Sequence, residues 1–283
     1  MIRAFIILFC VVGKVLAVSS IEQDFTCPFD GHHWKQRMET SANMKGMRLD
    51  LRQLGDVVQP PTLPQCPKCR AVLFLDSFPP EIVSALRPFV ESRDFAQAAG
   101  KYPSYHVFAQ MQEWLKAPAY YIGHSYLRAS WQSEDRPLVA RKYLAFAHRS
   151  LSAAFEAMKP ADKNYANTAL LLGEMERRLG RLEAAEARFR SLMNAEPFKE
   201  AGHQRIITRQ MELIANRDTL PRAVFAAHDV LVAVPATNLA ESKPARAGTV
   251  PIRRIDDAVP QSFDSISPGE KPLVPKSKHR AIH

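Results

Sequence analysis

The spacing of hydrophobic residues divides the chain into regions of different character. Between residues 81 and 217, apolar positions recur every three or four residues, which is typical of amphipathic helices. Residues 21–80 instead hold turn signals and short apolar runs, and residues 236–283 hold many prolines without a sustained period. This pattern predicts a mainly α-helical chain, with a small β-rich region before the helices and a disordered tail after them.

Residues 166–197 carry the clearest helical pattern. We expect a first helix over residues 165–179, capped by Gly180, because glycine adopts a left-handed backbone without a Cβ clash. A second helix should begin near Leu182 and end before Pro197, which cannot continue it. The two helices would form an antiparallel hairpin.

Small and large residues alternate where these two helices should meet. Leu182, Ala185, Phe189 and Leu192 form one stripe on the second helix. Gly173 of the first helix and Ala185 would allow close approach, and Phe189 would fill the remaining space. The arrangement resembles the tetratricopeptide repeat, a helical hairpin unit of about 34 residues.

The first helix of this hairpin also carries four charged residues. They recur at spacings of three and four, so we expect a solvated face with weak ion pairs along the helix. These residues are Glu174, Glu176, Arg177 and Arg178.

One repeat cannot bury its own apolar face, so neighbouring helices are expected. Upstream, Gly123 lies in a similar first-helix pattern, and Pro137 marks the start of another helix. Its apolar stripe comprises Leu144, Ala147, Leu151 and Phe155. Helices are also expected over residues 105–115 and 201–214, giving five to seven in total, and a short helix near residues 222–232.

The region before the helices should hold short strands around paired turns. Asp30-Gly31 is a turn signal. The run Ala71–Leu75 predicts one strand, and the partial alternation over Met47–Leu54 predicts another.

The N-terminus carries the three-part pattern of a secretory signal over residues 1–17. Arg3 precedes an apolar run over residues 4–12, and Val15-Leu16-Ala17 predicts cleavage after Ala17. A membrane anchor is the alternative, but a span needs about 20 apolar residues. We therefore expect an exported, periplasmic protein whose mature chain has no transmembrane span.

The net charge does not identify a class of partner. The net charge is +9, but basic and acidic residues are interleaved, so the sequence does not predict a nucleic-acid partner.

Signal removal would leave Cys27, Cys66 and Cys69, an odd number that does not suit a closed disulfide framework. Cys66-Pro67-Lys68-Cys69 is a C-x-x-C turn, and Cys27-Pro28-Phe29-Asp30-Gly31 begins in the same way. Two such turns facing each other commonly hold a structural zinc ion. The sequence therefore predicts a zinc-ribbon-like module over residues 21–80.

The fourth ligand of this site is Asp30 by spacing, because it stands where the second cysteine of the first turn would be. His32 is a substitute, and His33 is close by. A Cys66–Cys69 disulfide is the alternative in an oxidising compartment. A redox enzyme is disfavoured, since that motif opens a helix and a β-type run follows Cys69.

The order of several motifs resembles a bacterial family catalogued as domain of unknown function 2225. The motifs are Cys-Pro-x-x-Gly from Cys27, Arg48–Arg52, Cys-Pro-x-Cys from Cys66, Ile122-Gly123, Leu127–Trp131, Leu172–Glu174 and Arg177–Gly180. The likeness covers about residues 25–215. It implies a zinc-ribbon-like segment followed by tetratricopeptide-like helices, and no assigned activity. The chain departs from it at Asp30, where Cys is usual, and at Arg70, where Gly is usual.

Three hypotheses follow. The first is a non-enzymatic scaffold whose concave helical surface, over residues 81–217, holds a protein or peptide partner. The second is a metal-dependent or thiol-redox enzyme using the cysteine cluster. The third, a nucleic-acid-binding zinc ribbon, requires that the protein is not exported.

Overall fold

The computed structural model describes residues 20–39, 44–55 and 59–224. These residues all belong to one compact unit. The expected signal over residues 1–17 and the expected tail over residues 236–283 lie outside them, as does most of the helix expected near residues 222–232. Within that last range, Arg222–Val224 are described and are not helical.

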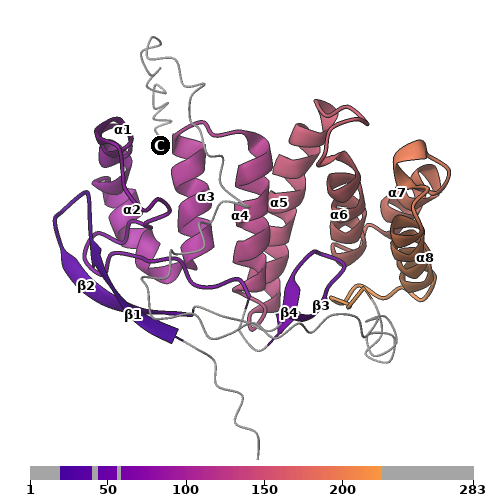
Figure 1. Ribbon diagram of the computed structural model, residues 1–283, viewed down its shortest axis with the longest axis horizontal. Coiled ribbons are helices and arrows are strands. Elements are labelled where there is room, and N and C mark those ends of the chain that lie inside the picture. Colours follow the sequence, from indigo (N-terminus) through magenta and orange to yellow (C-terminus); the bar gives the residue numbers. More distant parts are fainter. Residues whose placement is uncertain (1–19, 40–43, 56–58, 225–283) are drawn as a thin grey trace, which may run out of the picture. The chain divides into compact units, whose positions relative to one another are not determined.

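Helices dominate the described residues. They are α1 (Pro80–Val90), α2 (Arg93–Ala98), α3 (Ser104–Trp114), α4 (Ala119–Trp131), α5 (Pro137–Glu156), α6 (Tyr165–Arg178), α7 (Leu182–Met193) and α8 (Ala201–Ala215), with short 3-10 turns η1 (Ala99–Lys101) and η2 (Glu196–Phe198). From α3 to α8 each helix contacts the next, and short connections alternate their direction (Figure 1). The expected fold class, mainly helical with antiparallel stacking, is confirmed.

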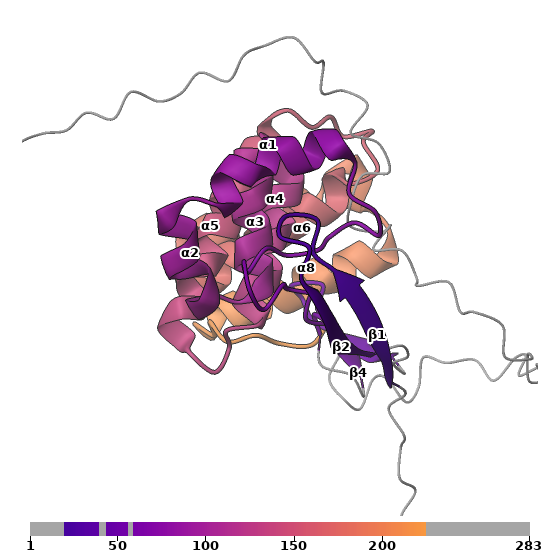
Figure 2. The same ribbon diagram turned by 90° about the vertical axis from the view of Figure 1, so that its left-hand side faces the viewer.

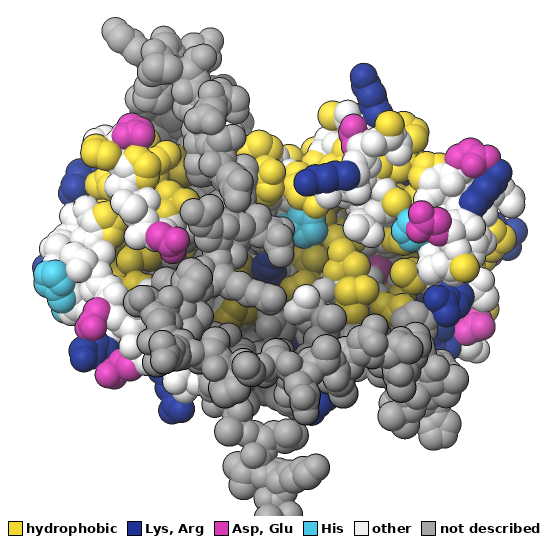
Figure 3. Space-filling view, viewed as in Figure 1, with side chains coloured by type: hydrophobic (Ala, Val, Ile, Leu, Met, Phe, Trp, Pro, Cys, Tyr) yellow, Lys and Arg dark blue, Asp and Glu magenta, His cyan; other side chains and the backbone are white. Residues whose placement is uncertain are grey.

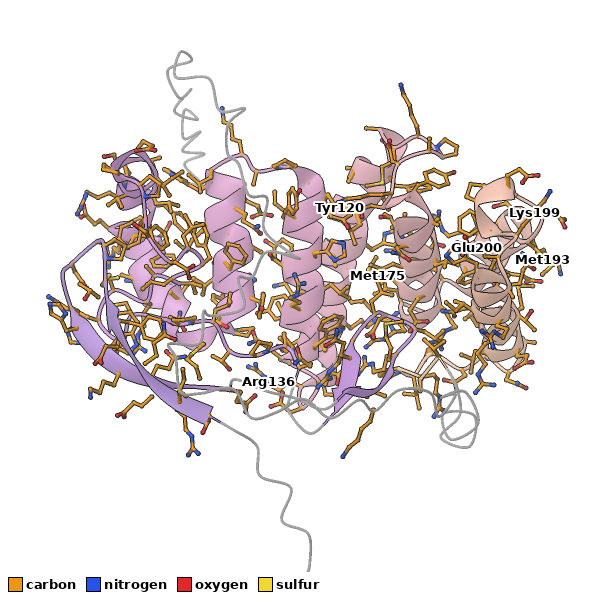
Figure 4. The ribbon with its side chains drawn as sticks, viewed as in Figure 1. Tyr120, Arg136, Met175, Met193, Lys199 and Glu200 are labelled. Carbon is orange, nitrogen blue, oxygen red and sulfur yellow. The ribbon has the colours of Figure 1, made fainter. Side chains whose placement is uncertain are left out.

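The side chains in Figure 4 follow this alternation. Tyr120 marks the start of α4, and Arg136 lies at the opposite end of the stack, where the chain passes from α4 to α5. Lys199 and Glu200 lie where α7 gives way to α8.

Helix number and position differ from expectation in one respect. The described residues hold eight α-helices, whereas the periodicity predicted five to seven. The unexpected pair is α1 and α2. The first contains Pro88, and the second spans only six residues, with Ser92 accepting a hydrogen bond from the Phe95 amide at its start. A proline inside a helix and a one-and-a-half-turn helix both weaken the periodic signal.

The hairpin predicted at residues 166–197 is present as α6 and α7. A Cβ atom built on Gly173 would lie only 2.4 Å from Cζ of Phe189, so glycine is required for these helices to approach so closely. Ala185 and Phe189 are both fully buried. Gly180 has a φ of 75°, as a left-handed C-cap requires.

The upstream pair, α4 and α5, repeats this construction. A Cβ atom on Gly123 would lie 2.5 Å from Cγ of Leu151, and Pro137 opens α5 as predicted. Leu144, Ala147 and Leu151 are buried on the inner face of α5. Two successive helix pairs therefore meet at a glycine of the first helix and a large side chain of the second.

The strands form two small antiparallel sheets. β1 (Ser20–Thr26) pairs with β2 (His33–Glu39), and β3 (Met44–Met47) pairs with β4 (Gln53–Gly55). Figure 2 shows β1 and β2 side by side. This confirms short strands around the Asp30-Gly31 turn.

The two predictions of a single strand, over Met47–Leu54 and over Ala71–Leu75, were both wrong in detail. Met47–Leu54 is not one strand, because the chain turns back within it to join β3 and β4. Ala71–Leu75 pairs only at Val72, which forms a bridge with Gln65. Ala71, Val72 and Phe74 are buried. A short apolar run can be buried without belonging to a sheet, so it does not by itself indicate a strand.

The expected solvated face of α6 was also wrong. Glu174 and Arg177 have fully buried side chains and pair with each other at 2.7 Å. Gln210 of α8 donates to Glu174 at 2.9 Å. Arg177 also donates to the main-chain oxygens of Asp218 and Leu220. The ion pair between residues three apart was predicted correctly, but neighbouring helices cover this face of α6.

Glu176 and Arg178, the other charged residues of that face, also turn inward. Glu176 is 5% exposed and accepts hydrogen bonds from Arg188 of α7 at 2.6 and 2.8 Å. Its Oε1 lies 3.3 Å from His148 Nε2 of α5. Burial opposes its ionisation, but Arg188 and His148 together lower the pKa of Glu176 to about 2. This carboxylate therefore joins three consecutive helices.

The exposed surface is mixed. On the face in Figure 3, hydrophobic side chains gather over the middle helices, and charged side chains lie toward both ends, over β1 and β2 and over α7 and α8. None of the described helices is long and apolar enough to cross a membrane.

Candidate metal centre

Two turns of the same construction hold the cysteines. In the first, the Gly31 amide donates to the Cys27 carbonyl at 3.0 Å; in the second, the Arg70 amide donates to the Cys66 carbonyl at 2.9 Å. Gly31 and Arg70 have φ values of 69° and 67°. The turns thus share their backbone path although one ends in glycine and the other in arginine.

A pair of extended segments closes each turn. The Cys27 amide donates to the His32 carbonyl at 2.9 Å, at the end of the β1–β2 ladder where Thr26 faces His33. The Cys66 amide donates to the Ala71 carbonyl at 2.9 Å, beside the single Gln65–Val72 bridge. The first turn therefore ends a hairpin, and the second ends a much shorter one.

The two turns face each other and bring four possible ligands together. One ligand atom from each of Cys27, Asp30, Cys66 and Cys69 lies within 4.8 Å of the others. Sγ of Cys27 is 3.5 Å from Sγ of Cys69, and Sγ of Cys66 is 3.6 Å from Oδ2 of Asp30. Tetrahedral bonds of ~2.3 Å from zinc to sulfur put neighbouring ligand atoms ~3.8 Å apart. The group is therefore of the right size for a tetrahedral metal ion.

Main-chain amides are directed at the ligand atoms in the same pattern in both turns. The amides of Phe29 and Asp30 bond the Cys27 sulfur, and those of Lys68 and Cys69 bond the Cys66 sulfur.

The second possible ligand of each turn also accepts a hydrogen bond from the main-chain amide of the residue two positions later. The Ala71 amide bonds the Cys69 sulfur, and the His32 amide donates to Oδ1 of Asp30 at 2.9 Å. Asp30 thus occupies the position of a second cysteine, including its main-chain hydrogen bond.

Without a metal ion, the three thiols differ in how readily each loses its proton. The hydrogen bond from Cys69 lowers the pKa of Cys27 to about 7, and the two amides of its turn assist. The same hydrogen bond raises the pKa of Cys69, and burial raises that of Cys66. For Asp30, burial opposes ionisation, but the His32 amide and the thiols prevail and lower its pKa. Metal binding would replace the remaining protons, as metal ligands must be deprotonated.

The predicted ligand set meets in space, with one exception. Cys27, Asp30, Cys66 and Cys69 come together, but the substitute ligand His32 is not part of the group. Its amide serves Asp30, while its ring stacks beside Trp34 with centroids 6.4 Å apart. All three cysteines are free thiols, so the Cys66–Cys69 disulfide is not formed in this structure.

The cysteine turns are attached to the helices by main-chain and aromatic contacts. Arg87 of α1 donates to the Phe29 carbonyl at 3.0 Å. The rings of Phe29, Phe78, Phe74 and Phe108 follow one another at centroid distances of 6.1, 5.0 and 4.8 Å. The first turn is therefore held against α1, and the row of aromatic rings continues to α3.

A second polar cluster was not foreseen from residue chemistry. Asp50, fully buried between β3 and β4, accepts hydrogen bonds from Arg48, from Trp131 of α4 at 2.9 Å and from Arg178 of α6 at 2.6 Å. Glu134 pairs with Arg48 at 2.7 Å. The only signal was the alternation Arg-Leu-Asp-Leu-Arg, which does not reveal partners some 80 and 128 residues away. This cluster attaches the β3–β4 hairpin to the helical stack.

No protein-family model, curated protein or solved structure matches this chain. The resemblance to the domain of unknown function 2225 and the identity of the tetratricopeptide repeat therefore stay predictions, and the arrangement of the described residues carries the functional conclusions.

Proposed function

We propose that this protein is an exported, non-enzymatic helical scaffold for a protein or peptide partner, and that a structural zinc ion holds its N-terminal segment. The observation that carries the proposal is the group formed by Cys27, Asp30, Cys66 and Cys69. Two turns of equal construction present it in front of a stack of helices.

Zinc is the ion that best suits this set of donors. Thiolates favour Zn²⁺ over hard cations such as Mg²⁺ and Ca²⁺, and a carboxylate oxygen is an accepted zinc ligand. Four protein ligands close the coordination shell, and closed shells are typical of structural sites, whereas catalytic zinc keeps an open position. Cys27 and Cys66 are 1% and 0% exposed, so little solvent reaches these two sulfurs, whereas Cys69 is half-buried.

The scaffold role is supported by the way the helices are built. The glycine contacts at Gly123 and Gly173 hold the two helices of each successive pair close together, and stacks of helical hairpins commonly present extended binding surfaces. Export is supported by the signal pattern over residues 1–17. The zinc ion would give the segment before α1 a fixed structure in this compartment.

Cobalt substitution tests the metal site. Co²⁺ bound by three thiolates and one carboxylate should give intense sulfur-to-cobalt charge-transfer bands and tetrahedral visible bands. The charge-transfer intensity should fall by about a third in Cys69→Ser and remain nearly unchanged in Asp30→Asn. His33→Ala is the matched control, since His33 is exposed on β2 outside the group. Octahedral spectra without sulfur bands would overturn the assignment.

Affinity capture from the exported fraction tests the scaffold role. The intact protein should retain a specific partner that Gly173→Leu does not, because a leucine at that position must separate α6 from α7. Gly202→Leu is the control, as a Cβ there meets nothing within 4 Å. Equal capture by all three proteins, or no specific partner, would contradict a scaffold function.

A further inference from the structure

A shallow groove of about 570 Å³ runs along the outer face of α5 and ends at the α6–α7 turn. Its lining includes the small residues Ala145, Ser152 and Ala153 together with Phe146 and Arg149. Arg181 closes it from the turn between α6 and α7. Small lining residues let the main chain of another segment approach closely, and Phe146 offers a partly exposed apolar contact.

The charges around this groove are unbalanced. α5 carries Arg141, Lys142 and Arg149, whereas its only acidic residue is Glu156, which lines one end of the groove. Arg141 is occupied, because it donates to the Leu179 carbonyl at the end of α6.

The other cations are directed at rings. Lys142 and Arg149 lie 5.7 and 5.6 Å from the centre of the Phe146 ring, and Arg181 lies 3.4 Å from the His148 ring nitrogen. Among the described residues, no carboxylate forms an ion pair with Lys142, Arg149 or Arg181. These three cations are therefore available to an external anion.

The neighbouring acidic residue does not neutralise them. Glu176 already accepts both hydrogen bonds of Arg188 and contacts His148. It also holds His148 in place, and Arg181 contacts the opposite nitrogen of the same ring. The lining of the groove is thus positioned in part by the contacts that join α5, α6 and α7.

We propose that this groove binds an acidic segment of a partner protein, with an apolar side chain against Phe146 and carboxylates facing Lys142, Arg149 and Arg181. The inference rests on the proposed scaffold function and names the class of its partner. An apolar contact with a complementary charged rim is the usual composition of a peptide-binding groove. Opposite charges would chiefly raise the association rate and the selectivity for acidic sequences.

A peptide suits the groove better than a nucleic acid does. Nucleic-acid surfaces space many cations along a phosphate backbone and add aromatic platforms for bases. Here Arg149 and Arg181 line the groove together with one phenylalanine and small residues, and Lys142 lies beside the phenylalanine ring.

Fluorescence anisotropy with a defined probe tests the inference. The probe is a labelled helical peptide of Glu, Ala and Leu with one Phe; the comparison peptides have Gln or Lys in place of Glu. The zinc-loaded full chain should bind the Glu peptide most tightly. The double variant Arg149→Glu/Arg181→Glu should weaken this binding by about tenfold or more, as loss of close charge pairs predicts. The control Lys101→Glu changes an exposed cation outside the groove.

Each further outcome decides the matter. Equal binding of the Glu and Lys peptides, or an unchanged affinity in the double variant, would overturn the inference. So would tighter binding of duplex DNA or of anionic vesicles than of the Glu peptide, with loss of that binding in the double variant. If the double variant still captures the protein partner, the groove assignment fails while the scaffold stands. If no variant or intact protein captures any partner, the scaffold itself fails.

Discussion

The cysteine turns and the helical stack are both made of paired similar units, but the pairs meet in opposite ways. The two turns converge on four polar ligand atoms within 4.8 Å of one another. The two helix pairs converge on dry contacts between a glycine and a large apolar side chain. Ionised ligand groups at such distances repel one another unless a cation lies between them. With zinc bound as proposed, we therefore expect the turns to depend on the ion for their stability, whereas the glycine contacts of the stack need no ion.

This difference also explains how the two regions tolerate change. The first turn has Asp30 and Gly31 where the second has Cys69 and Arg70, and the two turns still share one backbone path. In the stack, the space at Gly173 and Gly123 admits no further atom. Main-chain hydrogen bonds hold the turn geometry, while side-chain volume holds the helix geometry.

Removing a buried ligand should have the largest effect. Cys66→Ser is expected to lower zinc affinity by more than about 100-fold, because zinc loses a thiolate from a closed shell. A competition titration with a chromophoric chelator measures this.

Hydrogen exchange separates the two regions in the same variant. Amides of β1, β2 and the second turn should lose protection, while those of α4 to α7 retain it. Equal loss of protection in both regions would contradict the comparison.

Gly173→Ala should have the next largest effect. The new Cβ would lie 2.4 Å from Phe189, and overpacking of this kind costs about 3 kcal/mol at the upper end of its usual range. Urea unfolding measures the loss, and zinc affinity should not change.

Gly202→Ala is the matched control. Its Cβ meets nothing within 4 Å, and alanine favours helix over glycine by about 1 kcal/mol. A Gly173→Ala protein as stable as this control would refute tight packing between α6 and α7.

Glu176→Gln tests the polar contact within the stack, with an expected loss of about 2 kcal/mol at neutral pH. The pKa of Glu176 is lowered from an ordinary value of 4.5 to about 2. Its stabilisation should therefore be complete above about pH 4.5 and disappear as the pH falls toward 2. Denaturation curves across this range should decline more steeply for the intact protein than for Glu176→Gln. Parallel curves would show that the carboxylate is not held as described.

The smallest effect concerns the backbone of the turns. Arg70→Gly should stabilise the zinc-loaded protein by about 1 kcal/mol, because Arg70 has a positive φ that side chains with a Cβ disfavour. Gly31→Ala should destabilise it by a similar amount, for the same reason. Thermal unfolding with saturating zinc compares them. Changes of the same sign would indicate that the two turns do not share one backbone path.

The helical region could be predicted from the sequence because its determinants are local. Gly180, Pro137 and the stripe containing Phe189 mark ends and faces within a few residues. α6 ends one residue before its predicted end, and α7 begins at the predicted Leu182 and ends before Pro197. The grouping of Cys27, Asp30, Cys66 and Cys69 could be predicted for a similar reason, since their spacing within each turn is short.

Features that depend on distant partners could not be predicted. The α6 charges have the spacing of a solvated face, and only α5, α7 and α8 bury Glu176 and Glu174. Asp50 likewise acquires its role from Trp131 and Arg178. His32 had the right distance along the chain for a ligand, but its amide rather than its ring serves the site.

Native mass spectrometry of the folded, purified chain tests the central claim most directly. The account predicts a species that carries one zinc ion per chain, and an Asp30→Cys variant that retains zinc against higher chelator concentrations. A metal-free chain two hydrogen atoms lighter than the reduced mass would instead indicate a disulfide among Cys27, Cys66 and Cys69. That result would contradict a structural zinc site.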